Sequence, residues 1–342
     1  MSDASSKPAT KLRLALIGCG RIGRLHAERV AADGRAVLTA LLDPDPTAAK
    51  SLCSEVAEAA VVYPTFESLV EGAEFDAAVV ASPTHLHFEQ ASALLDRKTP
   101  VLCEKPLART RGEILVLIER SQKSQVPLSV AYQRRTWATY RALRRLVRSG
   151  EFGPVRAVAS HNVENWQSTI VGTWRDDPQM NPDGFIGDAG SHKIDAVFYV
   201  TGLEPLDVFA RCDRCGSRVE ITASVSAMLT GGVPLSMDFV GHGQHLGELL
   251  SIHCAHADLT LRDGELWLAR EERSERVPIT ETDSNPISAF LDTILQGAEN
   301  FAPPDCALPV YDFTRSLLDS SRSRCAVSLQ SPTPMGPLPK PE

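Results

Sequence analysis

The feature that most constrains the fold is a short apolar run, a glycine-rich hexapeptide and a helical segment that follow one another without a gap. The apolar run is "LRLALIG", residues 12–18, and the hexapeptide is "GCGRIG", residues 18–23. The next segment, "RLHAERVAADG", has helical periodicity and a stop signal at Gly34. A second buried strand, "AVLTALLD", ends at Asp43, about 20 residues beyond the last glycine. Strand, tight turn, helix and acid in this order predict a dinucleotide-binding unit.

Each glycine of the hexapeptide has a physical role in such a unit. Gly18 permits the tight turn, Gly20 lets the backbone approach a pyrophosphate, and Gly23 lets the helix pack closely on the strand. The helix N-terminus supplies N–H donors and positive dipole. The Asp43 carboxylate accepts hydrogen bonds from ribose hydroxyls and repels a 2′-phosphate, and "DPDP" offers no adjacent arginine to neutralise one. NAD is therefore the expected cofactor, rather than NADP.

Strand-like and helical segments continue to alternate as far as "PLSVAY", residues 127–132. This alternation predicts an α/β domain with a doubly wound parallel sheet. Because ligands bind beyond the carboxyl ends of such strands, "SPTHLH" (82–87) and "CEKP" (103–106) should face the cofactor. The expected cofactor-binding residues are Gly18, Gly20, Arg21, Ile22, Gly23, Asp43, Ser82, Pro83, His87, Glu104, Lys105 and Gln133.

Composition excludes several classes of protein. The chain has 342 residues and a net charge of −8, so it lacks the broad basic field that nucleic-acid binding requires. The basic helix face in "RALRRLVRSG", residues 141–150, is interpreted as a solvated face.

No stretch approaches the roughly 20 apolar residues of a membrane span. "LALIGC" resembles a lipoprotein cleavage box, but its apolar run is shorter than a signal core. A cytoplasmic protein is expected.

The eight cysteines show no regular spacing. One compact pair occurs in "CDRC", Cys212 and Cys215. A structural zinc site would require a second close pair on a tight loop, and the histidines further along the chain lie in strand-like sequence. No metal site is predicted, and a reducing compartment fits this cysteine usage.

Four motifs, "GCGRIG", "SPTHLH", "CEKP" and "GDAGSHKID" (187–195), occur in one order and spacing. With them the chain resembles the glucose-fructose oxidoreductase, inositol dehydrogenase and rhizopine-catabolism (Gfo/Idh/MocA) family over roughly residues 11–329. The resemblance implies an NAD-binding Rossmann domain at 11–131 and a C-terminal substrate-binding and oligomerisation domain at 132–330. That second domain is α/β with a large open, mostly antiparallel sheet. A tail at 1–10 and a Pro-rich tail at 331–342 flank them.

The expected second domain contains seven strand-like segments between residues 155 and 270, with turns at Gly231-Gly232 and Asp263-Gly264. One strand carries alternating apolar residues at Val225, Ala227 and Leu229. No later helices are obviously sufficient to cover both faces of the sheet. This apolar alternation is therefore expected to lie against another subunit, in a homodimer or homotetramer.

"GDAGSHKID" indicates the chemistry. On a helix, Asp188, His192 and Asp195 form one polar stripe at i, i+4 and i+7. Oxidation of an alcohol needs a base, and neutral imidazole suits pH 7, so His192 is the candidate. Asp188 either orients this imidazole or binds a substrate hydroxyl. A local contact between neighbouring side chains is the alternative explanation for the stripe.

Lys105 ends a strand near the expected nicotinamide, where its ammonium can stabilise a developing alkoxide. Pro106 restricts the turn, and a cis bond before it is possible. The resemblance assigns Lys105, Asp188 and His192 to one catalytic constellation.

The resemblance implies hydride transfer between NAD and a hydroxyl or keto carbon of a sugar, cyclitol or sugar derivative. Two alternatives on the same fold are an NAD-dependent glycosidase and a non-catalytic nucleotide-sensing regulator. Because aromatic faces pack on sugar C–H groups, four residues are candidate substrate contacts, with ordinary packing as the alternative. They are Asn162, Trp166, Trp174 and Arg175.

Overall fold

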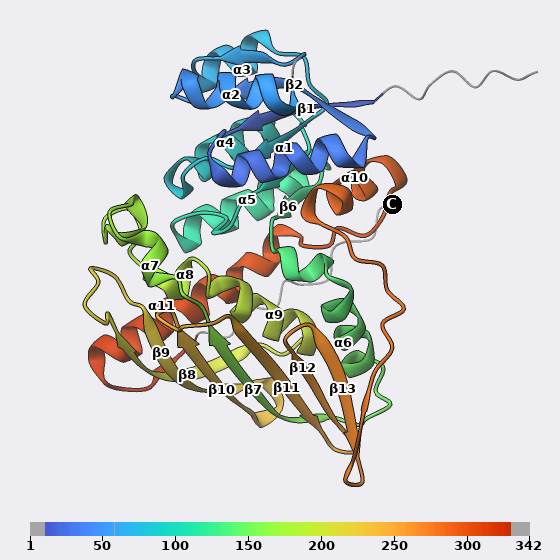
Figure 1. Ribbon diagram of the computed structural model, residues 1–342, viewed down its shortest axis with the longest axis vertical. Helices are drawn as coiled ribbons and strands as arrows, with labels where there is room; N and C mark the ends of the chain where they lie inside the picture. The colour runs from blue at the N-terminus through green and yellow to red at the C-terminus, as the bar shows by residue number, and fades with distance from the viewer. Residues whose placement is uncertain (1–10, 58, 330–342) are drawn as a thin grey trace, which may run out of the picture. The chain divides into compact units, whose positions relative to one another are not determined.

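The computed structural model of the chain describes residues 11–57 and 59–329, which form two compact units (Figure 1). The first unit contains the described residues up to Trp137 together with Asp283–Leu308. The second contains Ala138–Thr282 and the described residues from Pro309 onward. The sequence predicts one continuous C-terminal domain from residue 132, whereas residues 283–308 return to the first unit. The predicted tails at 1–10 and 331–342 lie outside the described residues.

A six-stranded parallel sheet forms the centre of the first unit. Its strand order is β3-β2-β1-β4-β5-β6, so the chain moves outward from β1 in both directions, and the predicted doubly wound sheet is confirmed. The strands are β1 Leu12–Ile17, β2 Ala36–Leu42, β3 Val61–Tyr63, β4 Ala77–Val80, β5 Val101–Cys103 and β6 Leu128–Val130. The helices between them are α1 Arg21–Asp33, α2 Pro46–Val56, α3 Phe66–Gly72, α4 Thr84–Asp96 and α5 Arg111–Ser124.

Local signals set the ends of several of these helices. Thr110 and Glu113 form a capping box at the start of α5, each accepting a hydrogen bond from the other's backbone N–H. α1 ends at Gly34, which adopts the left-handed conformation with a φ of 76° and donates its N–H to the carbonyl of Val30. Glycine adopts this φ without the cost that a Cβ would add.

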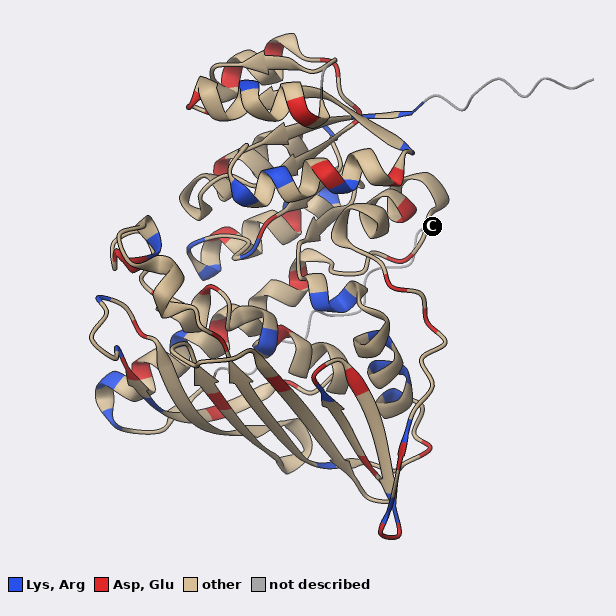
Figure 2. Ribbon diagram, in the orientation of Figure 1, with Lys and Arg blue, Asp and Glu red and all other residues tan. Residues whose placement is uncertain are grey.

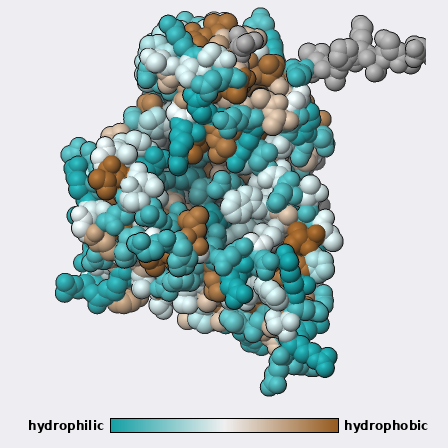
Figure 3. All heavy atoms as spheres, viewed as in Figure 1, coloured by the Kyte–Doolittle hydropathy of each residue, from teal (hydrophilic) through white to brown (hydrophobic). Residues whose placement is uncertain are grey.

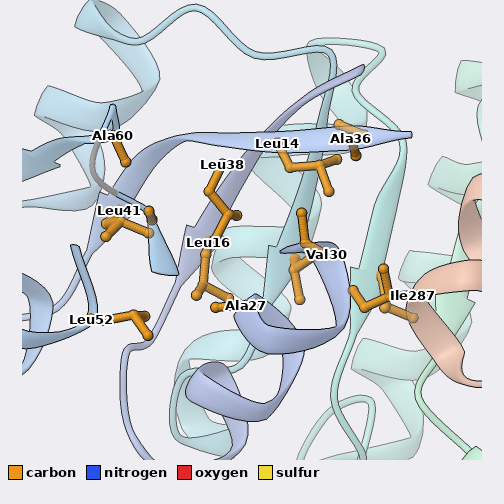
Figure 4. Packing of buried hydrophobic residues seen from close by; sticks show 14 of the residues in the cluster. Leu14, Leu16, Ala27, Val30, Ala36, Leu38, Leu41, Leu52, Ala60 and Ile287 are labelled. Carbon is orange, nitrogen blue, oxygen red and sulfur yellow. The ribbon is translucent and has the colours of Figure 1, made fainter. Parts of the chain in front are cut away.

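Helix α10, Pro286–Gln296, explains why residues 283–308 group with the first unit. Its apolar side chains at 287, 290 and 291 belong to the core cluster that includes Leu14 and Val30, as Figure 4 shows for Ile287. Polar contacts reinforce the packing. Arg35 binds Asp292 at 2.6 Å and Asp33 at 2.7 Å, and the Ser288 hydroxyl donates to Asp33 at 2.6 Å.

The second unit is built on a nine-stranded sheet in the order β14-β13-β12-β11-β7-β10-β9-β8-β15. β7 and β10 pair in parallel and the other neighbours are antiparallel, which confirms the expected mostly antiparallel sheet. Two short strands, β14 and β15, extend the seven expected. The strands are β7 Val155–Val163, β8 Pro205–Asp213, β9 Thr222–Leu229, β10 Val233–Val240, β11 Gly247–Cys254, β12 Asp258–Arg262, β13 Glu265–Arg270, β14 Arg273–Arg276 and β15 Val327–Ser328.

The remaining helices are α6 Ala138–Arg148, α7 Gln167–Ile170, α8 Gly184–Gly187, α9 Ser191–Thr201 and α11 Ala307–Ser323. Four short 3₁₀ turns complete the described elements: η1 Gln133–Thr136, η2 Trp174–Asp176, η3 Thr230–Gly232 and η4 Pro304–Cys306. Both predicted turns contain residues with positive φ, 78° and 74° at Gly231-Gly232 and 49° and 84° at Asp263-Gly264. The second pair closes the β12–β13 hairpin, whose two-residue turn requires positive φ at both positions.

The apolar alternation in β9 lies on the opposite face from the one expected. Val225, Ala227 and Leu229 are 5%, 5% and 0% exposed within this single chain. The expectation that they pack against another subunit is therefore wrong, because the chain's own packing already covers them. Ser224 and Ser226, which alternate with them, are exposed.

Three of the four arginines of α6, Arg141, Arg145 and Arg148, are exposed, as the solvated-face interpretation predicts, and the same side chains also make contacts within the chain. Figure 2 shows the basic residues along this helix, and their contacts are intramolecular. Arg141 and Arg145 bind residues 281–282, at distances of 3.2 and 2.7 Å. Arg144 stacks over the Tyr199 ring, 4.9 Å from its centroid. Arg148 donates to the carbonyls of Tyr199 at 2.6 Å and Val200 at 3.2 Å, where the last turn of α9 leaves acceptors without helical partners.

No helix among the described residues is long and apolar enough to cross a membrane. On the face drawn in Figure 3, hydrophobic residues occur in small separate groups among hydrophilic ones.

Candidate active site

The glycine loop between β1 and α1 is shaped by close backbone approaches. Gly18 has a φ of 97°, and a Cβ there would lie 2.6 Å from the backbone of Ala81. A Cβ at Gly23 would lie 1.9 Å from the Gly18 carbonyl oxygen. Gly20 differs, because it is exposed and a Cβ there would meet nothing within 4 Å. Backbone contacts thus constrain the loop at Gly18 and Gly23, while the loop is open at Gly20, next to the N-terminus of α1. This arrangement leaves space for the pyrophosphate of a dinucleotide.

Backbone hydrogen bonds join the strand ends of the first unit into one row. In four places the residue just after one strand donates its N–H to the carbonyl of the last residue of the neighbouring strand. The loops that follow β1, β2, β4, β5 and β6 therefore leave the sheet at the same edge. The donors and acceptors are Gly18 and Leu42 (2.7 Å), Ala81 and Ile17 (2.7 Å), Glu104 and Val80 (2.8 Å), and Ala131 and Cys103 (2.8 Å).

Asp43 follows β2 in this row and its carboxylate is oriented by backbone donors. One oxygen accepts from the Cys19 N–H at 2.7 Å and the other from the Asp45 N–H at 2.9 Å. Cys19 is part of the glycine loop, so the carboxylate lies beside that loop. Each carboxylate oxygen keeps acceptor capacity for a ribose hydroxyl.

The segment Glu104-Lys105-Pro106 follows β5, and its Lys105–Pro106 bond is cis. Glu104 contacts the buried ring of His26 on α1, with 2.9 Å between Oε1 and Nε2. Its other oxygen accepts from the Lys105 N–H at 3.2 Å. Burial raises the pKa of Glu104, but the hydrogen bond from His26 and neighbouring charges outweigh it, so the pKa of this carboxyl lies below its usual value. Glu104 is therefore ionised at neutral pH and accepts both hydrogen bonds.

His87 on α4, an expected cofactor-binding residue, is buried between the loops that follow β4 and β5. It is 1% exposed, and its ring nitrogens lie 2.8 Å from the carbonyl oxygens of Pro106 and Ser82. Burial lowers the pKa of His87 against the opposing effect of these carbonyls. The ring joins two loops of the first unit and has no nitrogen left for a nucleotide.

The other expected cofactor residues lie along the same edge. Ser82 donates its hydroxyl to the Gln90 side chain at 2.6 Å and keeps acceptor capacity. Pro83 and Arg21 are exposed, and Ile22 and Gln133 are half-buried. Gln133 begins η1 shortly after β6.

In the second unit, the expected helical stripe is broken. Helix α8 ends at Gly187, Asp188 has a φ of −82° and a ψ of −89°, and α9 starts at Ser191. A Cβ at Gly190 would lie 2.5 Å from the Ile186 carbonyl oxygen, so the chain can make this close turn only with glycine. The Ser191 hydroxyl donates to the Asp188 carbonyl at 2.7 Å. Asp188 and His192 therefore flank a helix break, and His192 occupies the first turn of α9.

The Asp188 carboxylate has a partner that sequence spacing does not indicate. Arg175 Nε donates to its Oδ2 at 2.8 Å, and the guanidinium also stacks on Trp174, 4.3 Å from the ring centroid. The Arg175 carbonyl accepts from the Asn181 side chain at 2.9 Å. Trp174 is 44% exposed. The three side chains Trp174, Arg175 and Asp188 form a contiguous group in which the aromatic ring is partly exposed.

Two of the candidate substrate residues are buried instead. Trp166 is 8% exposed and packs on Phe185, with ring centroids 5.4 Å apart. Asn162 is 1% exposed and donates to the Ser160 hydroxyl at 3.0 Å and the Asp238 carbonyl at 3.2 Å. Ordinary packing, the alternative explanation, accounts for both.

Sequence reasoning missed His26 and Lys193. His26 lies on the buried face of α1, and a histidine among the apolar positions of "RLHAERV" was the available signal. Lys193 is 5% exposed, and its Nζ lies 2.7 Å from Glu164. A lysine on the buried side of α9 requires such a partner, but the partner is distant in sequence. Among residues 11–57 and 59–329, no group of three or more His, Cys, Asp or Glu side chains is arranged to hold a metal ion.

The two units define a class: an α/β protein with a Rossmann-type dinucleotide site and a second unit built on an open, mostly antiparallel sheet. The chain belongs to the Gfo/Idh/MocA family. Residues 12–132 match the family domain described as "Oxidoreductase family, NAD-binding Rossmann fold", and residues 140–260 match the "GFO/IDH/MocA C-terminal domain". The expected family membership is therefore confirmed.

Individual relatives support this assignment. The chain is 27% identical over 201 residues to the rhizopine catabolism protein MocA of Rhizobium meliloti, covering 57% of this chain and 59% of that protein. It is 28% identical over 302 residues to an inositol 2-dehydrogenase of Acidothermus cellulolyticus, covering 83% and 82% of the two chains. The fold matches the WlbA dehydrogenase of Bordetella pertussis, solved with NADH and UDP-GlcNAcA, with a TM-score of 0.80 at 20% identity over 94% of this chain and all of that one. The chain spans only about three fifths of the length of some curated relatives, for example 59% of MocA. Several of the curated relatives are named as dehydrogenases, the Acidothermus protein among them.

Proposed function

We propose that this oxidoreductase uses NAD to oxidise a secondary alcohol of a sugar or cyclitol, or to reduce the corresponding ketone. The observation that carries the proposal is the row of strand ends in the first unit. Lys105 is next to Glu104, whose N–H belongs to this row, and the glycine loop and Asp43 follow strands that end at the same edge, which supports the proposal. A nucleotide-binding regulator needs the loop and the acid but has no use for an ammonium group at that edge.

NAD, when bound, accepts a hydride from the carbon that carries the hydroxyl. The protein supplies the remaining chemistry. Lys105 hydrogen-bonds the reacting oxygen and stabilises the charge that develops on it. His192 takes the hydroxyl proton as the general base.

Asp188 either orients the His192 imidazole or binds a substrate hydroxyl, and its ion pair with Arg175 is compatible with both roles. Arg175 binds one carboxylate oxygen of Asp188, and the carboxylate keeps acceptor capacity that an imidazole N–H or a substrate hydroxyl can use. The exposed Trp174 ring beside it suits the apolar C–H face of a sugar. We infer that Trp174, Arg175 and Asp188 line the substrate site.

A panel of inositols, aldoses, amino sugars and keto sugars, screened with NAD and NADP for absorbance of the reduced cofactor, tests the proposal. At least one member should reduce NAD stoichiometrically, and Lys105→Ala should abolish most of this turnover. Release of an aglycone without net NADH would instead identify a glycosidase. Tight NAD binding with neither reaction would contradict catalysis by this chain.

We also propose that the open face of the second unit's sheet forms a homodimer or homotetramer contact. Ser226 on β9 pairs with Ser236 on β10 and Phe209 on β8, and all three are exposed in the single chain. Small side chains around a partly exposed ring make a flat surface that a second copy can cover. Sedimentation should show an oligomer that Ser236→Arg dissociates, because the new charge would be buried without a partner. Val225→Ala, on the covered face, is the control and should leave assembly unchanged. A wild-type monomer at micromolar concentration would contradict this proposal.

A further inference from the structure

The Glu104-Lys105-Pro106 segment is contacted on two sides by buried histidines. His26 reaches it from α1 and His87 from α4, and each is 1% exposed. Both histidines lie in the first unit, as does the segment itself.

The first contact acts through Glu104. A carboxylate only accepts hydrogen bonds, so the ring nitrogen 2.9 Å away, His26 Nε2, is the donor. The other Glu104 oxygen accepts from the Lys105 N–H at 3.2 Å. His26 therefore fixes a side chain that in turn holds the backbone of Lys105.

The second contact acts through Pro106. His87 Nδ1 lies 2.8 Å from the Pro106 carbonyl, and its Nε2 lies 2.8 Å from the Ser82 carbonyl. A neutral imidazole donates from one nitrogen only, so in the Nδ1–H tautomer His87 donates to Pro106, and the rigid ring between the two carbonyls sets the spacing of the loops after β4 and β5. Together the histidines hold the residue before Lys105 and the residue after it.

We propose that His26 and His87 are positioning residues that fix the backbone of Lys105 and so direct its ammonium group at the reacting oxygen. This inference rests on the proposed function for its catalytic readout. Burying a polar imidazole ring costs free energy that an apolar side chain at the same position would not. Both buried histidines contact the same three-residue segment. Since a displacement of about 1 Å can cost 10²-fold in rate, loosening the segment should affect chemistry more than cofactor binding.

The test compares His26→Leu, which removes the donor, with His26→Gln, which keeps an N–H donor at the same reach. His26→Leu should lower kcat by about 10- to 100-fold with the Kd for NAD within about threefold of wild type. His26→Gln should recover most of the loss. Val30→Ala, on the same buried face of α1, is the matched control. It should lower Tm through lost packing while leaving kcat per folded enzyme unchanged.

A double-mutant cycle separates positioning from a merely structural role. In the Lys105→Ala background there is no ammonium left to position, so adding His26→Leu or His87→Leu should cause little further loss of kcat. Equal losses in both backgrounds would overturn the proposal. So would wild-type kcat in His26→Leu, or a loss confined to Tm and NAD affinity.

A second readout does not depend on any substrate. Hydrogen exchange at the backbone amides of residues 104–107 should be faster in His26→Leu and His87→Leu than in wild type, and unchanged in Val30→Ala. If no alcohol reduces NAD, the proposed function fails while the exchange data still decide whether the histidines hold the segment. Unchanged exchange in both histidine variants would overturn the inference whatever the substrate.

Discussion

The two units carry their candidate chemistry in different ways. In the first unit, the candidate dinucleotide-binding groups lie at strand ends: the backbone at the open Gly20 and the Asp43 carboxylate, which two backbone N–H groups orient. In the second unit, the candidate groups are side chains around a helix break, and their contacts come from distant parts of the chain, as in the pair Arg175–Asp188. A site of the first kind follows from the order of strands and glycines. A site of the second kind depends on packing, which local sequence does not specify.

Substitution of His192 should have the largest effect on catalysis relative to its effect on NAD binding. His192→Ala is expected to lower kcat by about 10² to 10⁴, the range of a positioned acid-base group, while the Kd for NAD stays near the wild-type value. The dinucleotide features described above all lie in the first unit, which is why binding should survive. Steady-state kinetics and a direct NAD titration measure the two effects. Near wild-type turnover on a verified substrate across pH 6 to 9 would show that His192 has a structural role only.

Asp188→Asn distinguishes the two roles open to this carboxylate. If it orients the imidazole, kcat should fall by about 10- to 100-fold, because an amide is a weaker partner for an imidazolium. If it binds a hydroxyl, the substrate KM should rise with a smaller change in kcat. Arg175→Met is the companion variant, since it removes the partner while leaving the carboxylate. Wild-type kcat and KM for Asp188→Asn would remove this residue from the site.

Asp43→Ser tests the first unit alone. The variant should weaken NAD binding by about tenfold or more and relieve repulsion of a 2′-phosphate, so the ratio of NAD to NADP affinity should fall. Titration with both cofactors measures the ratio. Loss of the two backbone contacts could loosen the glycine loop, so Asp43→Asn, which keeps one acceptor oxygen, serves as the control. A wild type that already prefers NADP would contradict the role given to Asp43.

Asp33 links α10 to the rest of the first unit, and its substitution should affect stability rather than catalysis. Hydrogen bonds from Arg35 and Ser288 lower the pKa of Asp33 to about 2, against the opposing effect of burial. Since an unfolded aspartate titrates near 3.9, the resulting stability is present above about pH 4 and is lost as the pH falls toward 2. Asp33→Asn should cost about 1–2 kcal/mol of unfolding free energy at pH 7. The difference from wild type should shrink below pH 4, as followed by urea unfolding. A cost that does not change with pH would show that the charge of Asp33 is unimportant.

The same contrast explains what the sequence could predict. The parallel sheet, the glycine loop and the open antiparallel sheet follow from short-range periodicity and turn chemistry, and Asp263-Gly264 is a clear instance. Periodicity also identified the alternation at Val225, but it could not say which face of the sheet the chain's own helices cover. The i, i+4 spacing of Asp188 and His192 predicts one continuous helix, whereas Gly187 and Gly190 permit the helix break that the structure contains.

Long-range partners account for the remaining differences. The arginines of α6 are largely exposed, as their spacing predicts, but that spacing could not indicate that Arg145 pairs with Glu281, a residue far along the chain. Trp166 and Trp174 are equivalent as sequence signals, and only packing against Phe185 distinguishes the buried ring from the exposed one. Family resemblance supplied the assignment of the catalytic residues, which composition and spacing alone would have left open.

The return of residues 283–308 to the first unit has a consequence for any attempt to divide or recombine this protein. The chain passes from one unit to the other after Trp137, after Thr282 and again after Leu308, so neither unit is a single contiguous piece. A fragment cut after residue 131 would expose the apolar surface that Ile287 and Phe290 cover, and a chimera exchanging only the N-terminal piece would give α10 a foreign neighbour. The transferable nucleotide-binding module is therefore two segments, and a graft that carries both should retain the core that a simple truncation loses.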